Sequence, residues 1–195
     1  MSVIVWGLTP GPGDAVPVAL TATIYTLEIE LADADRNVYE SLELRAARHP
    51  SESEEYFVTR VLAYLLEYTE GIAFSRGISD PDEPALTIRD LTGAITTWIE
   101  VGAPDAARLH KASKAASRVV VYTHKDPQQL LRNLAGEKIH RAESIELYAV
   151  DRGFVRDLAA KLERRMAFSV SVAEQTVYLS IDAETMTGVI TRLPL

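Results

Sequence analysis

The sequence predicts an α/β protein in which a mixed β-sheet is flanked by helices. Several segments alternate apolar and polar residues with the period of a strand, and others repeat apolar residues with the period of a helix. Between residues 94 and 150, predicted strands alternate with predicted helices, which favours parallel neighbours in the centre of the sheet. A hairpin near the beginning and three strands near the end predict antiparallel additions.

The first 20 residues are predicted to form a tail. A short apolar stretch, Val3–Trp6, is followed by the segment Thr9–Asp14, which is too rich in Pro and Gly to continue a helix or strand. A single domain is expected over residues 21–195. Its first two strands, residues 22–30 and 39–44, alternate in polarity and flank the turn residues 33–37, which predicts a β-hairpin.

The next segment predicts an amphipathic helix of about five turns that ends near Gly71. Pro50 precedes Ser51, a candidate N-cap, and Glu54 follows three residues later in the pattern of a capping box. The face expected to be buried against the sheet holds Phe57, Val61, Tyr64, Leu65 and Tyr68.

The rest of the chain continues the alternation of strands and helices. Strands are expected at residues 72–74, 85–89, 94–101, 118–123, 145–150, 168–172, 176–181 and 186–191. Helices are expected from Pro104-Asp105 to about Ser117, with Pro at the first helical position, and over residues 126–134 and 152–165. The strand at 118–123 is apolar on both faces, which is typical of a buried central strand.

Composition narrows the class of protein. The 195 residues include no cysteine, which excludes disulfides and zinc–thiolate sites. Apolar runs are far shorter than the about 18 residues of a membrane span, and no Lys or Arg precedes Arg36. We therefore expect a soluble, cytoplasmic protein with no membrane contact. The net charge of −8 disfavours a general nucleic-acid coat, but residues 101–141 carry a net charge of +5 and could make a local contact with nucleic acid.

Carboxylates gather before one predicted strand and at the end of the next. Asp80 directly precedes Pro81, Asp82 and Glu83 lie between Pro81 and Pro84, and Glu100 follows 18 residues after Asp82. If the two strands pair, their ends could present oxygens to one hard cation such as Mg²⁺. The alternative is a charged loop with an unrelated glutamate. Glu100 is predicted to share a strand face with Trp98, where a buried carboxylate needs a partner.

Six short motifs occur in the same order as in a known family. They are Ala47-Arg48-His49-Pro50-Ser51-Glu52, Phe74-Ser75-Arg76-Gly77, Asp82-Glu83-Pro84, Trp98-Ile99-Glu100, Pro104-Asp105 and Lys111-Ala112. With them the chain, from Thr21 to its C-terminus, resembles the YaeQ family, a small and poorly characterised bacterial family. The resemblance implies a variant of the restriction-endonuclease-like PD-(D/E)XK core with a metal-dependent site.

The resemblance assigns roles to individual residues. Asp82 stands at the position of the metal-binding aspartate of the pattern, with Glu83 beside it as a further ligand, and Glu100 stands at the position of the second acid. The pattern then requires a lysine two residues later, where this chain has Gly102. Lys111, on the helix that follows, is the expected substitute.

Two classes of function remain open. In the first, Asp82, Glu100, Lys111 and Glu55, an acid from the long first helix, form the catalytic site of a Mg²⁺- or Mn²⁺-dependent phosphodiesterase acting on nucleic acid. In the second, the chain is a non-catalytic binding protein that keeps the nuclease-like fold, with its acids paired to Arg76, Arg108 and Lys111. The substrate and the oligomeric state are left open by the sequence.

Overall fold

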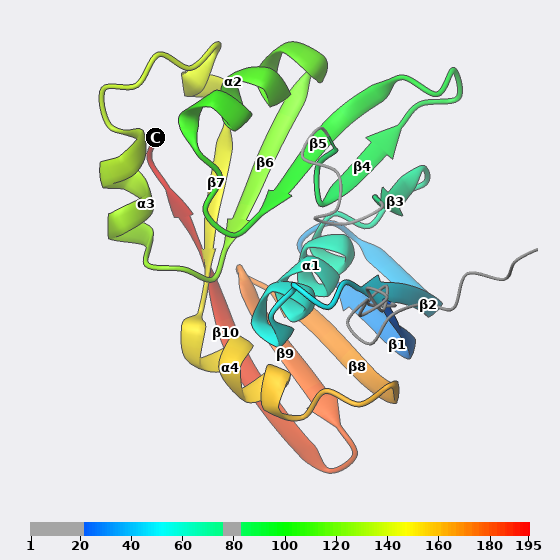
Figure 1. The fold of residues 1–195 in the computed structure, drawn as a ribbon. Helices are drawn as coiled ribbons and strands as arrows, with labels where there is room; N and C mark the ends of the chain where they lie inside the picture. Colours follow the sequence, from blue (N-terminus) through cyan, green and yellow to red (C-terminus); the bar gives the residue numbers. More distant parts are fainter. Residues whose placement is uncertain (1–21, 76–82) are drawn as a thin grey trace, which may run out of the picture.

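Ten strands pair into one mixed sheet that curls around helix α1 (Figure 1). The computed structural model describes residues 22–75 and 83–195, so the predicted tail lies outside the described residues. The strands are β1 (Thr23–Asp33), β2 (Val38–Arg48), β3 (Ile72–Phe74), β4 (Leu86–Arg89), β5 (Ile95–Val101), β6 (Arg118–Thr123), β7 (Glu146–Val150), β8 (Arg165–Ala173), β9 (Thr176–Ile181) and β10 (Glu184–Leu193). The helices are α1 (Glu54–Leu66), α2 (Ala106–Ala115), α3 (Pro127–Leu134) and α4 (Arg152–Ala160), with a 3₁₀ turn at Ala142–Ser144.

The strand order is β2-β1-β8-β9-β10-β7-β6-β5-β4-β3. Strands β5, β6 and β7 run parallel, which confirms the prediction from the alternating strands and helices. The antiparallel hairpin β1–β2 and the antiparallel strands β8–β9–β10 are also confirmed. The parallel pairing of β1 with β8 was not predicted, because it joins segments about 140 residues apart that carry no local signal for each other.

Each face of the sheet carries its own apolar cluster. On one face, α1 and α4 pack against strands from both halves of the sheet. The apolar cluster between them includes Phe57, Ile99 and Val120. On the other face, α2 and α3 cover the central strands, with Trp98, Leu109 and Val121 in contact. Because successive strand residues point to opposite faces, β5 sends Trp98 and Glu100 toward α2 and Ile99 and Val101 toward α1.

Arg60 of α1 links the two edge strands of the sheet. Its guanidinium donates to the carbonyl of Ala47 on β2 and lies 5.4 Å from the ring centroid of Phe74 on β3. The side chain is almost fully buried and also pairs with Glu52. One buried cation of α1 thus contacts both edge strands of the curled sheet.

The predicted bounds of α1 were wrong at both ends. Ser53, rather than Ser51, is the N-cap and accepts a hydrogen bond from the amide of Tyr56. The start shifts because the carboxylate of Glu52 turns back to the amide of His49 and to Arg60. At the other end, Arg36 donates to the carbonyls of Leu65 and Tyr68, and the helix ends at Leu66.

The expected apolar face of α1 was partly right. Phe57, Val61 and Leu65 are buried, but Tyr64 and Tyr68 are only partly buried. Tyr64 stacks on Phe74 with ring centroids 4.8 Å apart.

Two other helices are shorter than predicted. Asp105 is the N-cap of α2, because its carboxylate accepts from the amide of Arg108, and Pro104 therefore precedes the helix instead of occupying its first position. Helix α4 ends at Ala160, and β8 already begins at Arg165, where it pairs with Thr26 of β1. The pairing with β1 extends the strand over residues that continue the helical pattern in the sequence.

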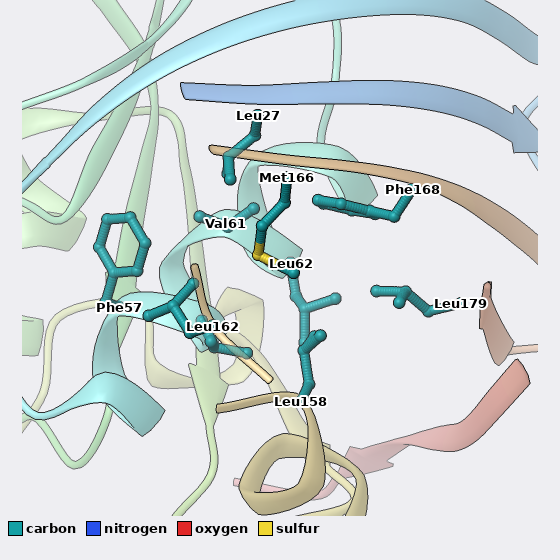
Figure 2. A pocket seen from close by; sticks show the side chains of 10 residues that line it. Leu27, Phe57, Val61, Leu62, Leu158, Leu162, Met166, Phe168 and Leu179 are labelled. Atoms are coloured by element: carbon teal, nitrogen blue, oxygen red, sulfur yellow. The ribbon is translucent and has the colours of Figure 1, made fainter. Parts of the chain in front are cut away.

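An apolar hollow lies where α1 and α4 meet the sheet (Figure 2). Its cavity volume is only about 20 Å³, and it is lined only by apolar side chains, which are Leu27, Phe57, Val58, Val61, Leu62, Leu158, Leu162, Met166, Phe168 and Leu179. A lining without polar side chains offers no group for acid–base or metal chemistry. In the described parts of the chain, no helix has the length and apolar character needed to span a bilayer.

Candidate functional site

The carboxylate of Glu100 is buried at the end of β5, beneath α2. The indole Nε1 of Trp98 donates to Oε1 of Glu100 at 2.6 Å, and Nε of Arg108 donates to the same oxygen at 2.7 Å. Glu100 and Trp98 are each only 3% exposed. The structure confirms that Glu100 and Trp98 share a face, and it identifies the partners that the buried carboxylate was expected to need.

Both hydrogen bonds converge on one oxygen of Glu100. Among the described residues, none donates a hydrogen bond to the second oxygen, Oε2. Burial raises the pKa of Glu100, and the hydrogen bonds from Trp98 and Arg108 only partly oppose this effect. The site therefore holds a carboxylate whose negative charge is incompletely compensated by the residues described around it.

Arg108 connects this carboxylate to the segment that carries the acidic loop. Its second terminal nitrogen, Nη2, donates to the backbone carbonyl of Glu83 at 2.6 Å. Strands β4 and β5 are neighbours, as the acidic-site hypothesis requires, and they pair antiparallel with Leu86 opposite Ile99. Glu83 therefore reaches the Glu100 site through its main chain, and Glu83 itself is partly buried.

Part of the predicted acidic constellation cannot be placed. Asp82 and Arg76 lie outside the described residues. Within residues 22–75 and 83–195, no group of three His, Cys, Asp or Glu side chains is arranged to hold a metal ion. The assignment of Asp82, Glu83 and Glu100 as metal ligands stays a prediction.

The backbone explains why position 102 carries no lysine. Gly102 has φ of +94°, in the left-handed region that disfavours residues with a side chain. Its amide donates to the carbonyl of Tyr122 at 2.9 Å, and a Cβ built at this position would lie 3.6 Å from the ring of Tyr56. A lysine on this backbone would be strained.

The two remaining predicted residues lie on different helices. Lys111 is exposed on α2, three residues after Arg108 and thus on the same side of that helix. Glu55 is partly exposed in the first turn of α1, which packs on the opposite face of the sheet from α2. No hydrogen bond or ion pair joins the described side chains of Glu55 and Glu100, and a catalytic role for Glu55 stays a prediction.

Sequence reasoning missed two residues near this end of the sheet. The ring of Tyr56 lies edge-on to that of His124, with centroids 6.4 Å apart, and burial raises the pKa of Tyr56 to about 12. His124 is 4% exposed, and within residues 22–75 and 83–195 neither of its ring nitrogens has a hydrogen-bond partner. The available signal was alternation: Val120 and Tyr122 lie on the α1 face of β6, and His124 continues this spacing of two residues just past the end of the strand.

Comparison with known proteins identifies the family. The model of the family described as YaeQ protein matches residues 18–189. The chain belongs to the YaeQ family. It is 32% identical over 166 residues to the uncharacterised protein YaeQ of Escherichia coli K12, covering 85% of this chain and 92% of that protein. The YaeQ relative from Salmonella typhi is also 32% identical, over 164 residues, covering 84% of this chain and 91% of that protein.

Solved YaeQ structures share the fold. The crystal structure of the protein from Pseudomonas syringae superposes with a TM-score of 0.81 at 34% identity, covering 89% of this chain and 97% of that one. The structure from Xanthomonas axonopodis pv. citri gives a TM-score of 0.81 at 31% identity, covering 89% of this chain and 99% of that one. The family assignment and the mixed α/β fold are therefore established, and the relatives named as uncharacterised carry no activity over to this chain.

Proposed function

We propose that this YaeQ protein is a divalent-cation-dependent phosphodiesterase that acts on nucleic acid, with a restriction-endonuclease-like PD-(D/E)XK arrangement of acids. The observation that carries the proposal is the hydrogen bonding of the Glu100 carboxylate. Trp98 and Arg108 hold its Oε1, while no described residue donates to its Oε2. A carboxylate oxygen that accepts no hydrogen bond from the described residues is the kind of hard ligand that Mg²⁺ and Mn²⁺ bind.

The residues at this site fit such a cation. A divalent ion on Oε2 would offset the burial that raises the pKa of Glu100. The proposal requires Asp82 to supply the second carboxylate. Glu83, the next residue in the sequence, is held to the same site by the bond from Arg108 to its carbonyl. When bound, the cation would lower the pKa of a water molecule and stabilise charge on the phosphodiester.

The chain's own cations would position the substrate. Arg108 holds Glu100 and the main chain of Glu83 by hydrogen bonds. Lys111 lies on the same side of α2 and would take the role of the pattern's lysine, because a lysine at position 102 would be strained by the positive φ there. The exposed cations of residues 101–141 that would contact phosphates along the nucleic acid are Lys114, Lys125, Arg132 and Lys138. Arg118 is not among them, because its guanidinium is turned to Glu67 and Glu146.

A thermal-shift comparison tests the proposal. A cation that binds only the folded protein stabilises it by about 2.7 kcal/mol at a hundredfold excess over Kd. For a chain of this size that corresponds to a rise in Tm of about 5–10 °C with Mg²⁺ or Mn²⁺. Glu100→Gln should abolish the rise, whereas the control Glu137→Gln, at an exposed position after α3, should keep it.

Activity is measured on the same three proteins. Labelled single- and double-stranded DNA and RNA should be cleaved by the wild type and Glu137→Gln in the presence of the cation, and not by Glu100→Gln. A wild type whose Tm does not respond to either cation contradicts the proposal. In that case the Glu100–Arg108 ion pair is structural, and the chain is a non-catalytic binding protein with a nuclease-like fold.

A further inference from the structure

We propose that Trp98 is a positioning residue for the cation site, because its indole N–H fixes the Glu100 carboxylate so that Oε2 faces the ion. This inference rests on the proposed function. The carboxylate torsion at the end of a glutamate side chain is broad and soft. A buried glutamate therefore needs fixed donors to keep one oxygen in place, and partners of this kind orient metal ligands in many proteins.

The orientation of Trp98 is set by packing. Its ring lies in the apolar cluster between β5 and α2, together with Leu109 and Ala112. An indole N–H can only donate, and here it donates to Glu100 Oε1 at 2.6 Å between two residues that are each 3% exposed. The bond joins residues two apart on one strand, so its geometry is fixed by the pleat of β5 as well as by the packed ring.

Trp98 differs from the other donor in charge. Arg108 brings a positive charge to Glu100, so it compensates the same negative charge that a divalent ion would compensate. The indole is neutral, and it orients the carboxylate without opposing a cation electrostatically. Loss of the indole N–H should therefore weaken cation binding.

The first measurement uses the fluorescence of Trp98 in the full chain. The sequence contains two tryptophans, Trp6 and Trp98, so the Trp6→Phe variant leaves Trp98 as the single reporter. Titration with Mn²⁺ should change its emission in a saturable way, with the same Kd as the thermal shift.

The second measurement removes the donor. Trp98→Phe keeps an aromatic ring but has no N–H, and its Kd for Mn²⁺, measured by thermal shift, should be about 10- to 100-fold weaker than that of the wild type. Leu109→Val is the matched control, because it loosens the same apolar cluster without touching the hydrogen bond. Its Kd should equal that of the wild type. If Trp98→Phe fails to fold, substitution of benzothienylalanine for Trp98 removes the N–H at nearly constant shape.

The outcomes separate this inference from the proposed function. If Mn²⁺ binds the wild type and Trp98→Phe equally well, Trp98 has no positioning role while the cation site stands. If Leu109→Val weakens binding as much as Trp98→Phe does, packing and not the hydrogen bond is responsible, and the inference is again overturned. If Mn²⁺ changes neither the emission nor the Tm of the wild type, the proposed function fails and this inference fails with it.

Discussion

The two ends of the central strands differ in how completely their buried charged groups are hydrogen-bonded. At the amino ends of β6 and β7, Arg118 donates to both carboxylate oxygens of Glu67 and both of Glu146. The hydroxyls of Tyr122 and Tyr148 add one further bond to each glutamate. All four carboxylate oxygens of this Arg118 cluster thus have donors.

At the carboxyl ends, polar groups are left incompletely paired. Glu100 has described donors on only one oxygen, and among the described residues neither ring nitrogen of His124 has a hydrogen-bond partner. Apart from the His124 nitrogens, the buried side-chain atoms without partners in the described parts of the chain are Nε of Arg48, Oε1 of Glu52 and Nε of Arg60, in and just before α1. Unpaired buried polar groups cost stability.

The pKa shifts follow the same division. Hydrogen bonds from Arg118 lower the pKa of Glu146. Burial lowers the pKa of Arg118, but its bonds to Glu146 and Glu67 outweigh this effect and the net shift is upward. Burial instead raises the pKa of Glu100. The comparison teaches that a buried acid beside an arginine is a candidate for chemistry only where its hydrogen bonds are incomplete. The Arg118 cluster is structural by this criterion, and the Glu100 site is not.

The largest effect on stability is expected from Arg118→Ala. The substitution leaves Glu67 and Glu146 without their shared cation. The Arg118 side chain is 37% exposed, so water screens part of the loss, and the missing charge-assisted hydrogen bonds should cost about 2.5 kcal/mol in the free energy of unfolding by urea. Arg156→Ala, which removes an exposed pair with Asp157, should cost less than about 0.5 kcal/mol. Equal losses in the two variants would show that the Arg118 cluster is not a closed structural unit.

The next effect concerns pH at the opposite end. His124 ordinarily titrates at 6.5, but burial, and then Lys125 and Arg152, lower its pKa to about 4 in the fold. Between these values only the unfolded chain binds the proton, so stability from the neutral imidazole is lost as the pH falls. The titration of His124 should therefore lower the free energy of unfolding by about 2 kcal/mol when the pH falls from 7.5 to 5.

His124→Phe removes this titration at nearly constant volume. The difference in the free energy of unfolding between wild type and variant, measured at the two pH values, isolates His124 from the carboxylates that titrate nearby. The variant should be the more stable protein at pH 5. An unchanged difference between pH 7.5 and 5 would mean that His124 is paired in solution and that the two ends of the strands are more alike than the structure indicates.

The smallest effect distinguishes two stacked tyrosines within the Arg118 cluster. Tyr122→Phe removes a buried hydrogen bond to Glu67 and should cost about 1.5 kcal/mol. Tyr148→Phe removes a partly buried bond to Glu146 and should cost about 0.5 kcal/mol. Urea unfolding of the two variants measures the difference, and a reversed order would contradict the depth assigned to the two glutamates.

The sequence by itself determined much of the architecture. The alternation of apolar and polar residues predicted the hairpin and the shared face of Trp98 and Glu100, because the strand period is local and burial enforces it. The alternation of strands with helices predicted the central parallel strands. The same local reasoning misplaced the start of α1, since Glu52 is used by Arg60 and the amide of His49 and leaves the capping role to Ser53.

Only the tertiary structure decided which charges meet. The sequence offered Arg76, Arg108 and Lys111 as equal partners for the acids, and the fold pairs Glu100 with Arg108, eight residues away on the next helix. The sequence gave no sign that Arg118 would form an ion pair with Glu67, which lies 51 residues earlier in the chain. It also gave no hint that the backbone at Gly102 turns to positive φ beneath Tyr56. Strand and helix periods are set by neighbours along the chain, whereas ion pairs and backbone turns are set by segments that become neighbours only when the sheet curls around α1.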